Sequence, residues 1–194
     1  EADKQYEEAV VQFNKALSMD KSHTEIYKDI SDVYEKKRDF PKAIEAYKNY
    51  LDEMKSSPDI SDLFLYGRLN YYAATDSAYQ DKQPTYLAEA DTIFAQVAVK
   101  VPDNYLGNFW RARVNSLRDP ETTQGLAKPY YEAALSILEQ KPDATKSVLV
   151  ECNSYLGYYY FVKEDYNQSK QYWNKILEID PENETATKAL GGIK

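Results

Sequence analysis

The chain is 194 residues long, with 43% hydrophobic and 29% charged residues, a balance that favours a folded protein over a disordered one. Its net charge is -8 and its sequence pI is about 4.8, so its summed field repels nucleic-acid phosphates and anionic membrane surfaces. One cysteine and one histidine exclude an internal disulfide framework and a multi-cysteine metal site. We therefore expect no nucleic-acid partner, no metal and no other cofactor.

The termini and the hydropathy pattern also limit the cellular setting. No stretch approaches the roughly 18 consecutive apolar residues of a membrane span, and the N-terminus EADKQYEEAV lacks the basic start and apolar core of a signal peptide. We expect no membrane insertion by this segment. Because the chain starts without Met, inside a helical pattern, we also expect it to be a piece of a longer protein. The compartment stays open, export or a periplasmic location included.

Apolar residues recur at three- and four-residue spacings along the whole chain, and only six glycines and eight prolines interrupt them. Four prolines fall at the joints between periodic runs: Pro58, Pro102, Pro142 and Pro181. A residue that lacks an N–H and fixes φ ends one helix or opens the next. The sequence therefore predicts an all-α protein.

The N-terminal part predicts one lone helix and then a helix pair. Residues 1–20 place Tyr6, Ala9, Phe13 and Ala16 on one side, as expected for the second helix of an incomplete pair. Residues 24–57 predict a complete pair joined by the turn KRDF at 37–40. The residues expected to pack between its helices are Tyr27, Ile30, Ser31, Tyr34, Ala43, Tyr47 and Tyr50.

Two longer pairs follow at residues 60–102 and 105–142. The first opens at Tyr66-Gly67 and carries the stretch TDSAYQDKQPT, residues 75–85, which we expect to be an inserted hairpin loop. In the second pair Ala112 takes the place of the glycine, and a loop is expected at 118–125. The residues expected to pack in their second helices are Ala90, Phe94, Val97, Ala127, Tyr131 and Ala134. Whether the loops form the rim of a binding surface or are neutral insertions stays open.

The C-terminal part predicts a last pair, residues 150–183, and the start of a further or capping helix at 184–194. The turn KEDY at 163–166 corresponds to KRDF in the first pair. The residues that carry the pattern are Leu156, Gly157, Tyr160, Ser169, Trp173, Ile176 and Pro181, followed by Leu190-Gly191.

These spacings resemble the tetratricopeptide repeat family, in which leucine, glycine and tyrosine mark a first helix and small, aromatic and small residues mark a second. Ser169 and Ile176 stand where the family usually has alanine, and Asn153 stands where it often has tryptophan. The phrase FWRARVNSLRDPETTQGLAKPYYE, residues 109–132, resembles bacterial tetratricopeptide repeat proteins of largely unassigned role. The resemblance covers nearly the whole chain and implies a single domain, residues 1–194, forming a right-handed superhelical solenoid of antiparallel helix pairs.

The resemblance further implies that the first helices line a concave groove. The residues that follow each small residue are expected to face it: Asp32, Arg68, Arg113 and Tyr158. The full candidate peptide-binding set is Phe64, Arg68, Tyr71, Phe109, Trp110, Arg113, Tyr155 and Tyr158. A guanidinium beside aromatic rings can hold a carboxylate or stack on a planar group, although each arginine could equally be an ordinary ion-paired surface residue. The peptide-carboxylate clamp of some family members uses Lys and Asn on the first groove helix. Lys28 matches the Lys, but Asp32 stands in place of the Asn.

Few residues suggest chemistry. Two carboxylate pairs share a helix face, Asp29 with Asp32 and Asp59 with Asp62. With 32 acidic residues such pairs arise by chance, and Asp59 is better placed to cap a helix. We expect His23 to be an exposed turn residue and Cys152 to pack as a small apolar residue. The sequence therefore predicts no catalytic residues.

The sequence favours a non-catalytic scaffold that docks a segment of an unidentified protein partner in an aromatic, arginine-bearing groove. Two other interpretations stay open. The chain could be an accessory or regulatory segment of a larger enzyme, or it could serve a glycan-handling envelope complex in which aromatic rings stack on sugars. Self-association through an uncapped end is a further expectation.

Overall fold

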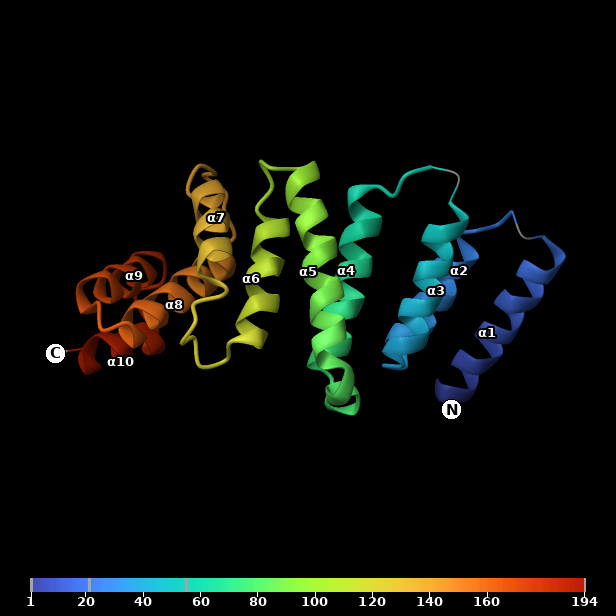
Figure 1. Cartoon of the computed structure of the whole chain (residues 1–194), viewed down its shortest axis with the longest axis horizontal. Helices are drawn as coiled ribbons and strands as arrows, with labels where there is room; N and C mark the ends of the chain where they lie inside the picture. The colour runs from blue at the N-terminus through green and yellow to red at the C-terminus, as the bar shows by residue number, and fades with distance from the viewer. Residues whose placement is uncertain (1, 21, 55, 194) are drawn as a thin grey trace. The chain divides into compact units, whose positions relative to one another are not determined.

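The computed structural model describes residues 2–20, 22–54 and 56–193, and within them every regular element is a helix (Figure 1). In chain order the elements are α1 (Ala2–Met19), α2 (Ile26–Lys36), α3 (Phe40–Glu53), α4 (Ile60–Thr75), the 3-10 helix η1 (Ser77–Lys82), α5 (Gln83–Lys100), α6 (Leu106–Arg118), α7 (Lys128–Leu138), α8 (Lys146–Val162), α9 (Tyr166–Ile179) and α10 (Glu184–Gly192). The prediction of an all-α solenoid is confirmed. In these ranges no helix is both long and apolar enough to cross a bilayer.

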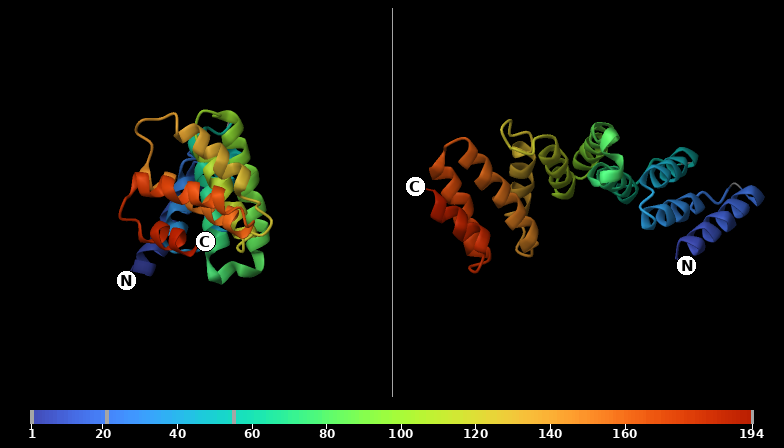
Figure 2. Two further views of the ribbon diagram at one scale, coloured as in Figure 1. Left: turned by 90° about the vertical axis from the view of Figure 1, so that its left-hand side faces the viewer. Right: turned by 90° about the horizontal axis from the view of Figure 1, so that it is seen from below.

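The helices group into two compact units, the first ending at Ile93 and the second starting at Phe94. In the first unit α2 packs against α1 and α3, and α3 packs against α4. In the second unit α6, α7, α8, α9 and α10 pack in succession, as the further views of Figure 2 show. Each unit has its own core. The buried residues are Ala43, Tyr47, Tyr50 and Leu69 in a cluster of the first, and Trp173, Ile176, Ala186 and Ile193 in a cluster of the second.

The predicted correspondence between the turns KRDF and KEDY is confirmed. Arg38 and Glu164 both adopt a left-handed backbone, with φ of 59° and 60°. The next residue, Asp39 or Asp165, caps the following helix by accepting a hydrogen bond from the backbone N–H three residues on. The helices α3 and α9 begin at residues 40 and 166 and end at 53 and 179, a shift of 126 residues at both ends. The two helix pairs therefore share one register.

The small residues mark where helix backbones approach each other. In α2–α3 the hydroxyl of Ser31 donates to the carbonyl oxygen of Ala43 at 2.8 Å. In α8–α9 the hydroxyl of Ser169 donates to the carbonyl oxygen of Gly157, also at 2.8 Å, so the equivalent bond starts from the opposite helix. A Cβ at Gly157 would lie 2.7 Å from Cε2 of Trp173. The indole ring therefore requires glycine at this position.

The expected hairpin loop at 75–85 is wrong, because the stretch is mostly helical. Asp76 ends α4 and caps η1, accepting from the N–H of Ala78 at 3.0 Å and from Arg38 Nη2 at 2.7 Å. The helix α5 begins directly after η1. Pro84 is tolerated in the first turn of α5, because an N–H at that place has no partner within the helix. The polar residues that suggested a loop are therefore helix caps.

The expected loop at 118–125 is present and is organised by one buried carboxylate. Asp119 ends α6 and accepts from the backbone N–H groups of Gly125 at 2.7 Å and Gln124 at 3.0 Å. Burial raises the pKa of Asp119, but the hydrogen bonds from the loop outweigh it and hold the pKa below its usual value. In the last pair α8 begins at Lys146, before the expected start of the repeat at residue 150.

Candidate functional site

The eight residues of the predicted site belong to two units. Phe64, Arg68 and Tyr71 lie on α4 in the first unit. The second unit holds the other five, Phe109, Trp110 and Arg113 on α6, and Tyr155 and Tyr158 on α8. The structure thus provides one surface on α4 and another on α6 and α8, and the concave groove expected to unite them remains a prediction.

On α4 the predicted arginine makes a long ion pair. Arg68 Nη2 lies 3.4 Å from Glu35 Oε1 on α2, and its guanidinium carbon lies 5.7 Å from the ring centre of Tyr72. Within the described ranges, its buried Nε has no hydrogen-bond partner. Tyr71 packs edge-on against Tyr72 with ring centres 6.0 Å apart. Phe64 is half-buried. The Arg68 guanidinium is therefore partly exposed, weakly paired and close to an aromatic ring.

On α6 the predicted arginine is bound much more firmly. Arg113 donates from Nε and Nη2 to the two carboxylate oxygens of Glu151 at 2.7 and 2.6 Å. Its guanidinium carbon lies 4.5 Å from the ring centre of Phe109 and 5.0 Å from that of Trp110. The hydroxyl of Tyr131 on α7 donates to the same carboxylate at 3.2 Å. This arrangement joins α6, α7 and α8, so its first role is to fix three helices.

Two predicted contact residues lie inside the protein. Phe109 is 3% exposed and Trp110 is 7% exposed. Trp110 packs on Phe94 with ring centres 5.4 Å apart, and Phe109 packs edge-on against Tyr131 at 6.3 Å. Contrary to the sequence prediction, these two rings belong to the packing between helices and are not accessible to a partner.

The C-terminal half of α8 presents aromatic rings to solvent. Tyr158 is 43% exposed and Phe161 is 42% exposed, and a three-residue spacing places them on one helix face. Phe161 lies 5.9 Å from Tyr166, which opens α9 and is itself exposed. We call Tyr158, Phe161 and Tyr166 the α8 aromatic patch. Tyr155 borders it but packs its ring on Tyr131 at 4.7 Å.

Only Tyr158 of this patch belongs to the predicted peptide-binding set. Phe161 follows it on the same helical stripe, and Tyr166 directly follows the helix cap Asp165. An aromatic residue at a helix start, beside a turn, is a signal that could have identified Tyr166.

One of the two acidic pairs that could have suggested catalysis forms a helix cap. Asp59 accepts from the N–H of Asp62 at 2.8 Å, and Asp62 accepts from the N–H of Asp59 at 3.3 Å, which is a reciprocal capping box. Lys28 Nζ lies 3.3 Å from Asp62 Oδ1. Lys28, the residue that fits a carboxylate clamp, is thus bound within the unit. The capping role expected of Asp59 is confirmed.

The single histidine and the single cysteine lie where the sequence places them. His23 is exposed, with Nε2 3.2 Å from Asp20. Cys152 is buried, and burial raises the pKa of its thiol to about 12. Among the described residues, no group of three His, Cys, Asp or Glu side chains could hold a metal ion.

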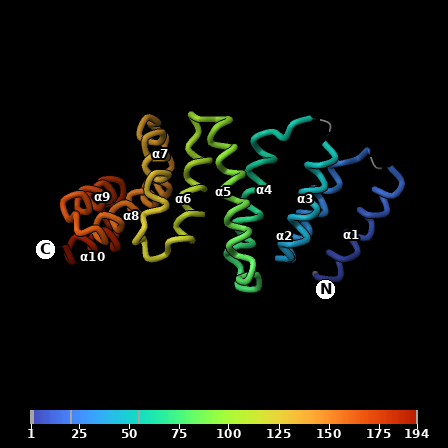
Figure 3. Tube along the Cα trace, viewed as in Figure 1, coloured from blue at the N-terminus to red at the C-terminus, as the bar shows by residue number. Residues whose placement is uncertain are grey.

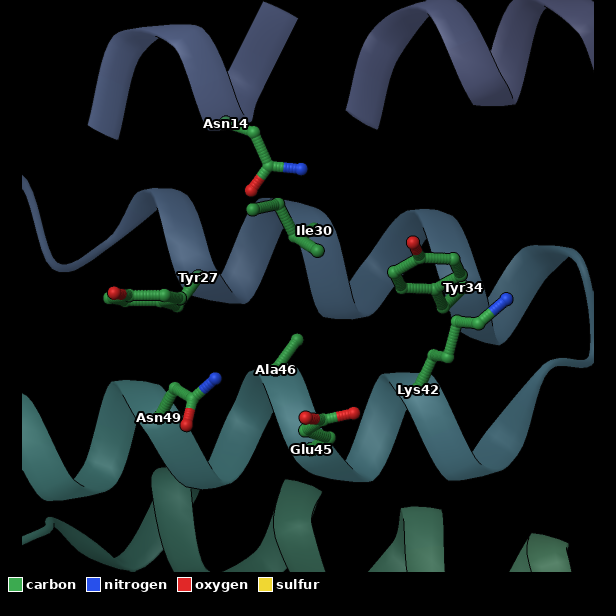
Figure 4. Close-up of a pocket in the computed structure, with 8 residues that line it drawn as sticks. All are labelled: Asn14, Tyr27, Ile30, Tyr34, Lys42, Glu45, Ala46 and Asn49. Atoms are coloured by element: carbon green, nitrogen blue, oxygen red, sulfur yellow. The ribbon is translucent and has the colours of Figure 1, made fainter. Parts of the chain in front are cut away.

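Two hollows between helices stand apart from the predicted site residues. The first has a volume of about 140 Å³ and lies between α1, α2 and α3 (Figure 4). Figure 4 shows Tyr27 and Tyr34 at its two ends, with Ile30 and Ala46 between them. The second has a volume of about 430 Å³ and is bounded by α8, α9 and the end of α7, with Asn153 in its wall. We call it the Asn153 hollow.

Comparison with known proteins places this geometry in context. A family model described as a tetratricopeptide repeat matches residues 155–183. No curated protein matches the chain. Among solved structures, it is similar to the C-terminal part of a tetratricopeptide repeat-containing protein from Cytophaga hutchinsonii, with a TM-score of 0.79 and 31% identity over 93% of this chain. The match spans 65% of that structure, so the chain covers less than two thirds of its length.

Two more distant structures share the fold alone. A thermophilic tetratricopeptide repeat protein from Thermus thermophilus matches with a TM-score of 0.56 and 16% identity, over 98% of this chain and 91% of that one. YrrB, a tetratricopeptide repeat protein with an unusual peptide-binding site, matches with a TM-score of 0.64 and 18% identity, over 96% of this chain and 84% of that one.

Proposed function

Because the chain is built of tetratricopeptide repeats, we propose that it is a scaffold that holds a segment of another protein and performs no chemistry on it. Helix pairs of this length stack because none can bury its own apolar face, and the stack leaves side-chain surfaces for a partner. The peptide-binding site of YrrB supports peptide recognition as a use of this fold.

The α8 aromatic patch is the observation that carries the proposal. The chain buries Phe109, Trp110 and Tyr131, yet it leaves the rings of Tyr158 and Phe161 about two-fifths exposed. Aromatic rings that remain exposed side by side supply large contact areas at low entropic cost, which is typical of the centre of a protein interface. We propose that apolar side chains of the bound segment pack on this patch.

The Arg113–Glu151 pair supports the patch from the same helix. Glu151 lies two turns before Tyr158 on α8, and its hydrogen bonds to α6 and α7 hold the helix in place. A helix fixed in this way presents its aromatic rings without further ordering, which lowers the entropic cost of binding. On the first unit we propose that the partly exposed guanidinium of Arg68, beside the ring of Tyr72, supplies a separate polar contact.

A displayed library of random peptides tests the proposal. Peptides selected on the full chain are expected to bind the double variant Tyr158→Ala with Phe161→Ala roughly tenfold more weakly, as for residues at the centre of an interface. The matched control is Val99→Ala, which removes an apolar side chain that is 80% exposed on α5. Binding is measured by isothermal titration calorimetry.

The controls decide the outcome. If no peptide is enriched over an empty support, or if the selected peptides bind the double variant as tightly as the Val99→Ala protein, the patch is not a recognition site. Circular dichroism checks that both variants keep the helical content of the parent, since all three side chains are exposed.

A further inference from the structure

The hollow of Figure 4 has the size of one aromatic ring. Its apolar walls are Tyr27, Ile30 and Tyr34 from α2 and Ala46 from α3, and its volume is about 140 Å³. An apolar cavity of about 150 Å³ is large enough to hold one benzene molecule. The hollow therefore has room for about one six-membered ring.

Tyr34, at one end of this hollow, has a counterpart in the last helix pair. The shift of 126 residues that relates α3 to α9 also relates Tyr34 to Tyr160. The carbonyl oxygen of each tyrosine accepts a hydrogen bond from the backbone N–H five residues on, at 2.9 Å in both pairs. The two rings therefore start from the same place on the same backbone path.

The residue that faces this tyrosine differs between the two pairs. In α8–α9 it is Tyr172, whose ring stacks on that of Tyr160 with ring centres 5.6 Å apart and planes 8° apart. In α2–α3 the same register position is Ala46, which offers only a methyl group. Among the described residues no aromatic ring stacks on Tyr34. The second pair thus has an internal ring where the first pair has a hollow.

The ring of Tyr34 is accessible from the hollow. Tyr27 and Tyr34 are half-buried, whereas Ile30 and Ala46 are each 5% exposed and line the base. Lys42 Nζ lies 5.3 Å from the ring centre of Tyr34, and Figure 4 shows this end of Lys42 pointing away from Tyr27. The space between the two tyrosines, beside Ala46, is therefore left open.

The charges at the hollow and across the first unit favour a basic occupant. Lys42 pairs with Asp39 at 2.8 Å, so these two charges balance. Glu45, which also lines the hollow, forms no ion pair with any described residue. Residues 1–93 contain 19 acidic and 12 basic side chains, a net charge of -7, so residues 94–194 account for only -1 of the total of -8. A positively charged segment is therefore attracted to the first unit.

We propose that the hollow of Figure 4 binds an aromatic side chain from a basic stretch of a partner protein. The ring stacks on Tyr34 as Tyr172 stacks on Tyr160, and a flanking Lys or Arg of the partner approaches Glu45. The hollow lies in the first unit and shares no residue with the α8 aromatic patch, so this proposal and the proposed function can fail separately.

Titration of the full chain with three short peptides, followed by NMR, tests the chemistry. The probes are acetyl-Lys-Tyr-Lys-amide, the same peptide with leucine in place of tyrosine, and the same peptide with both lysines replaced by glutamate. The first is expected to bind tightest. Replacing the ring by leucine should weaken binding roughly threefold, and reversing the charges should weaken it roughly fivefold. Shifts should be centred on Ile30, Tyr34 and Ala46.

Substitutions on the two helices separate stacking from folding. Ala46→Tyr should supply the ring from within, as Tyr172 does, and weaken the lysine–tyrosine peptide roughly tenfold without lowering the midpoint of thermal unfolding. Tyr34→Leu keeps an apolar wall but removes the stacking surface, so the preference for the tyrosine peptide over the leucine peptide should vanish. Ala88→Tyr, at an exposed position of α5, is the matched control and should bind as the parent does.

Several results would overturn the proposal. These are equal affinity for the tyrosine and leucine peptides, equal affinity for the lysine and glutamate peptides, unchanged binding by Ala46→Tyr, or no shifts up to the solubility limit of the peptides. If Ala46→Tyr does not fold, an unchanged preference for tyrosine in Tyr34→Leu has the same force. Shifts centred on Tyr158 and Phe161 would move the site to the α8 aromatic patch and leave the proposed function standing.

Discussion

The helix pairs α2–α3 and α8–α9 have the same backbone register but different space between their helices. In α2–α3 Tyr27 is large and Ala46 is small, and the hollow of Figure 4 opens beside Ala46. In α8–α9 the equivalent of Ala46 is Tyr172, whose ring stacks on Tyr160 at 5.6 Å with planes 8° apart. The open space lies instead beside Asn153. Exchanging large and small side chains thus moves a hollow along an unchanged backbone.

Figure 3 shows the Cα trace of both pairs, each a first helix, a short turn and an antiparallel second helix. The caps and turns that fix this path are short-range features, whereas the volume between helices depends on side chains far apart in sequence. Repeats can therefore diverge in what they bind while keeping the contacts that hold them together.

The largest expected effect comes from the core aromatic residue that the two pairs share in register. Trp173→Ala should lower the free energy of unfolding by about 3–5 kcal/mol, because a buried ring is lost and Gly157 leaves no side chain to fill the space. Tyr47→Ala should cost a similar amount in the first unit. Urea denaturation measures both losses, and hydrogen exchange should localise each loss to its own unit. A loss below about 1 kcal/mol for either variant would show that the two positions are not equivalent.

Asp119 in the second unit and Asp76 in the first allow the two units to be compared by the pH dependence of their stability. Asp119→Asn should lower the free energy of unfolding by about 1–3 kcal/mol, because the loop N–H groups lose a charged acceptor. The pKa of Asp119 is lowered in the folded protein, so its stabilising effect is full above the ordinary carboxyl pKa of about 4 and is lost as the pH falls through the lower folded value.

The pH dependence gives this prediction its control. The pKa of Asp76 is also lowered, first by the N–H of Ala78 and then by Arg38, so stability should still fall with acid in the Asp119→Asn protein, but less steeply than in the parent. Asp103→Asn, at an exposed position, is the matched substitution control. An identical acid profile for parent and Asp119→Asn would contradict the assigned role. Thermal unfolding between pH 2 and pH 7 measures it.

A smaller effect is expected at the two serines that donate between helices in opposite directions. Ser31→Ala and Ser169→Ala should each cost about 0.5–1.5 kcal/mol, since each removes one buried hydrogen bond. The loss at Ser169 is informative because alanine is the family's usual residue there. Ser136→Ala, at an exposed position of α7, is the control for urea denaturation. Greater stability in Ser169→Ala would mean that the bond to Gly157 contributes nothing.

The smallest expected change in the free energy of unfolding is at the two turns, where it should differ between Glu164 and Arg38. Glu164→Gly should raise the free energy of unfolding by about 0.5–1 kcal/mol, because glycine adopts a positive φ without strain. Arg38→Gly relieves the same strain but loses the bonds to Asp76 at 2.7 and 3.1 Å, so it should gain less. Differential scanning calorimetry resolves the order. An equal gain in both variants would show that the Arg38–Asp76 contact is energetically neutral.

The sequence predicted the features of the fold that depend on nearby residues. Helices follow from three- and four-residue spacing, and the turns at 37–40 and 163–166 were expected from their equivalent places in two repeats. The structure adds that each turn has a left-handed residue followed by a cap residue. The stretch 75–85 was misread because Asp76 caps a helix as well as it starts a loop. Local polarity alone does not distinguish the two.

The candidate site was predicted less well, because exposure is decided by helices distant in sequence. Phe109 and Trp110 share a helix with Arg113, and only the positions of Tyr131 and Phe94 show that both rings are buried. The partner of Arg113 is 38 residues away, beyond any helical spacing. The asparagine at 153 was visible as a departure from the family pattern, but the hollow beside it depends on three helices together.

The rate at which the Cys152 thiol is modified would report how often α8 opens. Its thiol is fully covered and its pKa is raised to about 12, so in the closed protein it carries almost no reactive thiolate at neutral pH. The chain has no second cysteine, and a colorimetric thiol reagent would therefore report the opening rate of this one helix. The unaltered chain thus carries its own chemical reporter of breathing motions in the second unit.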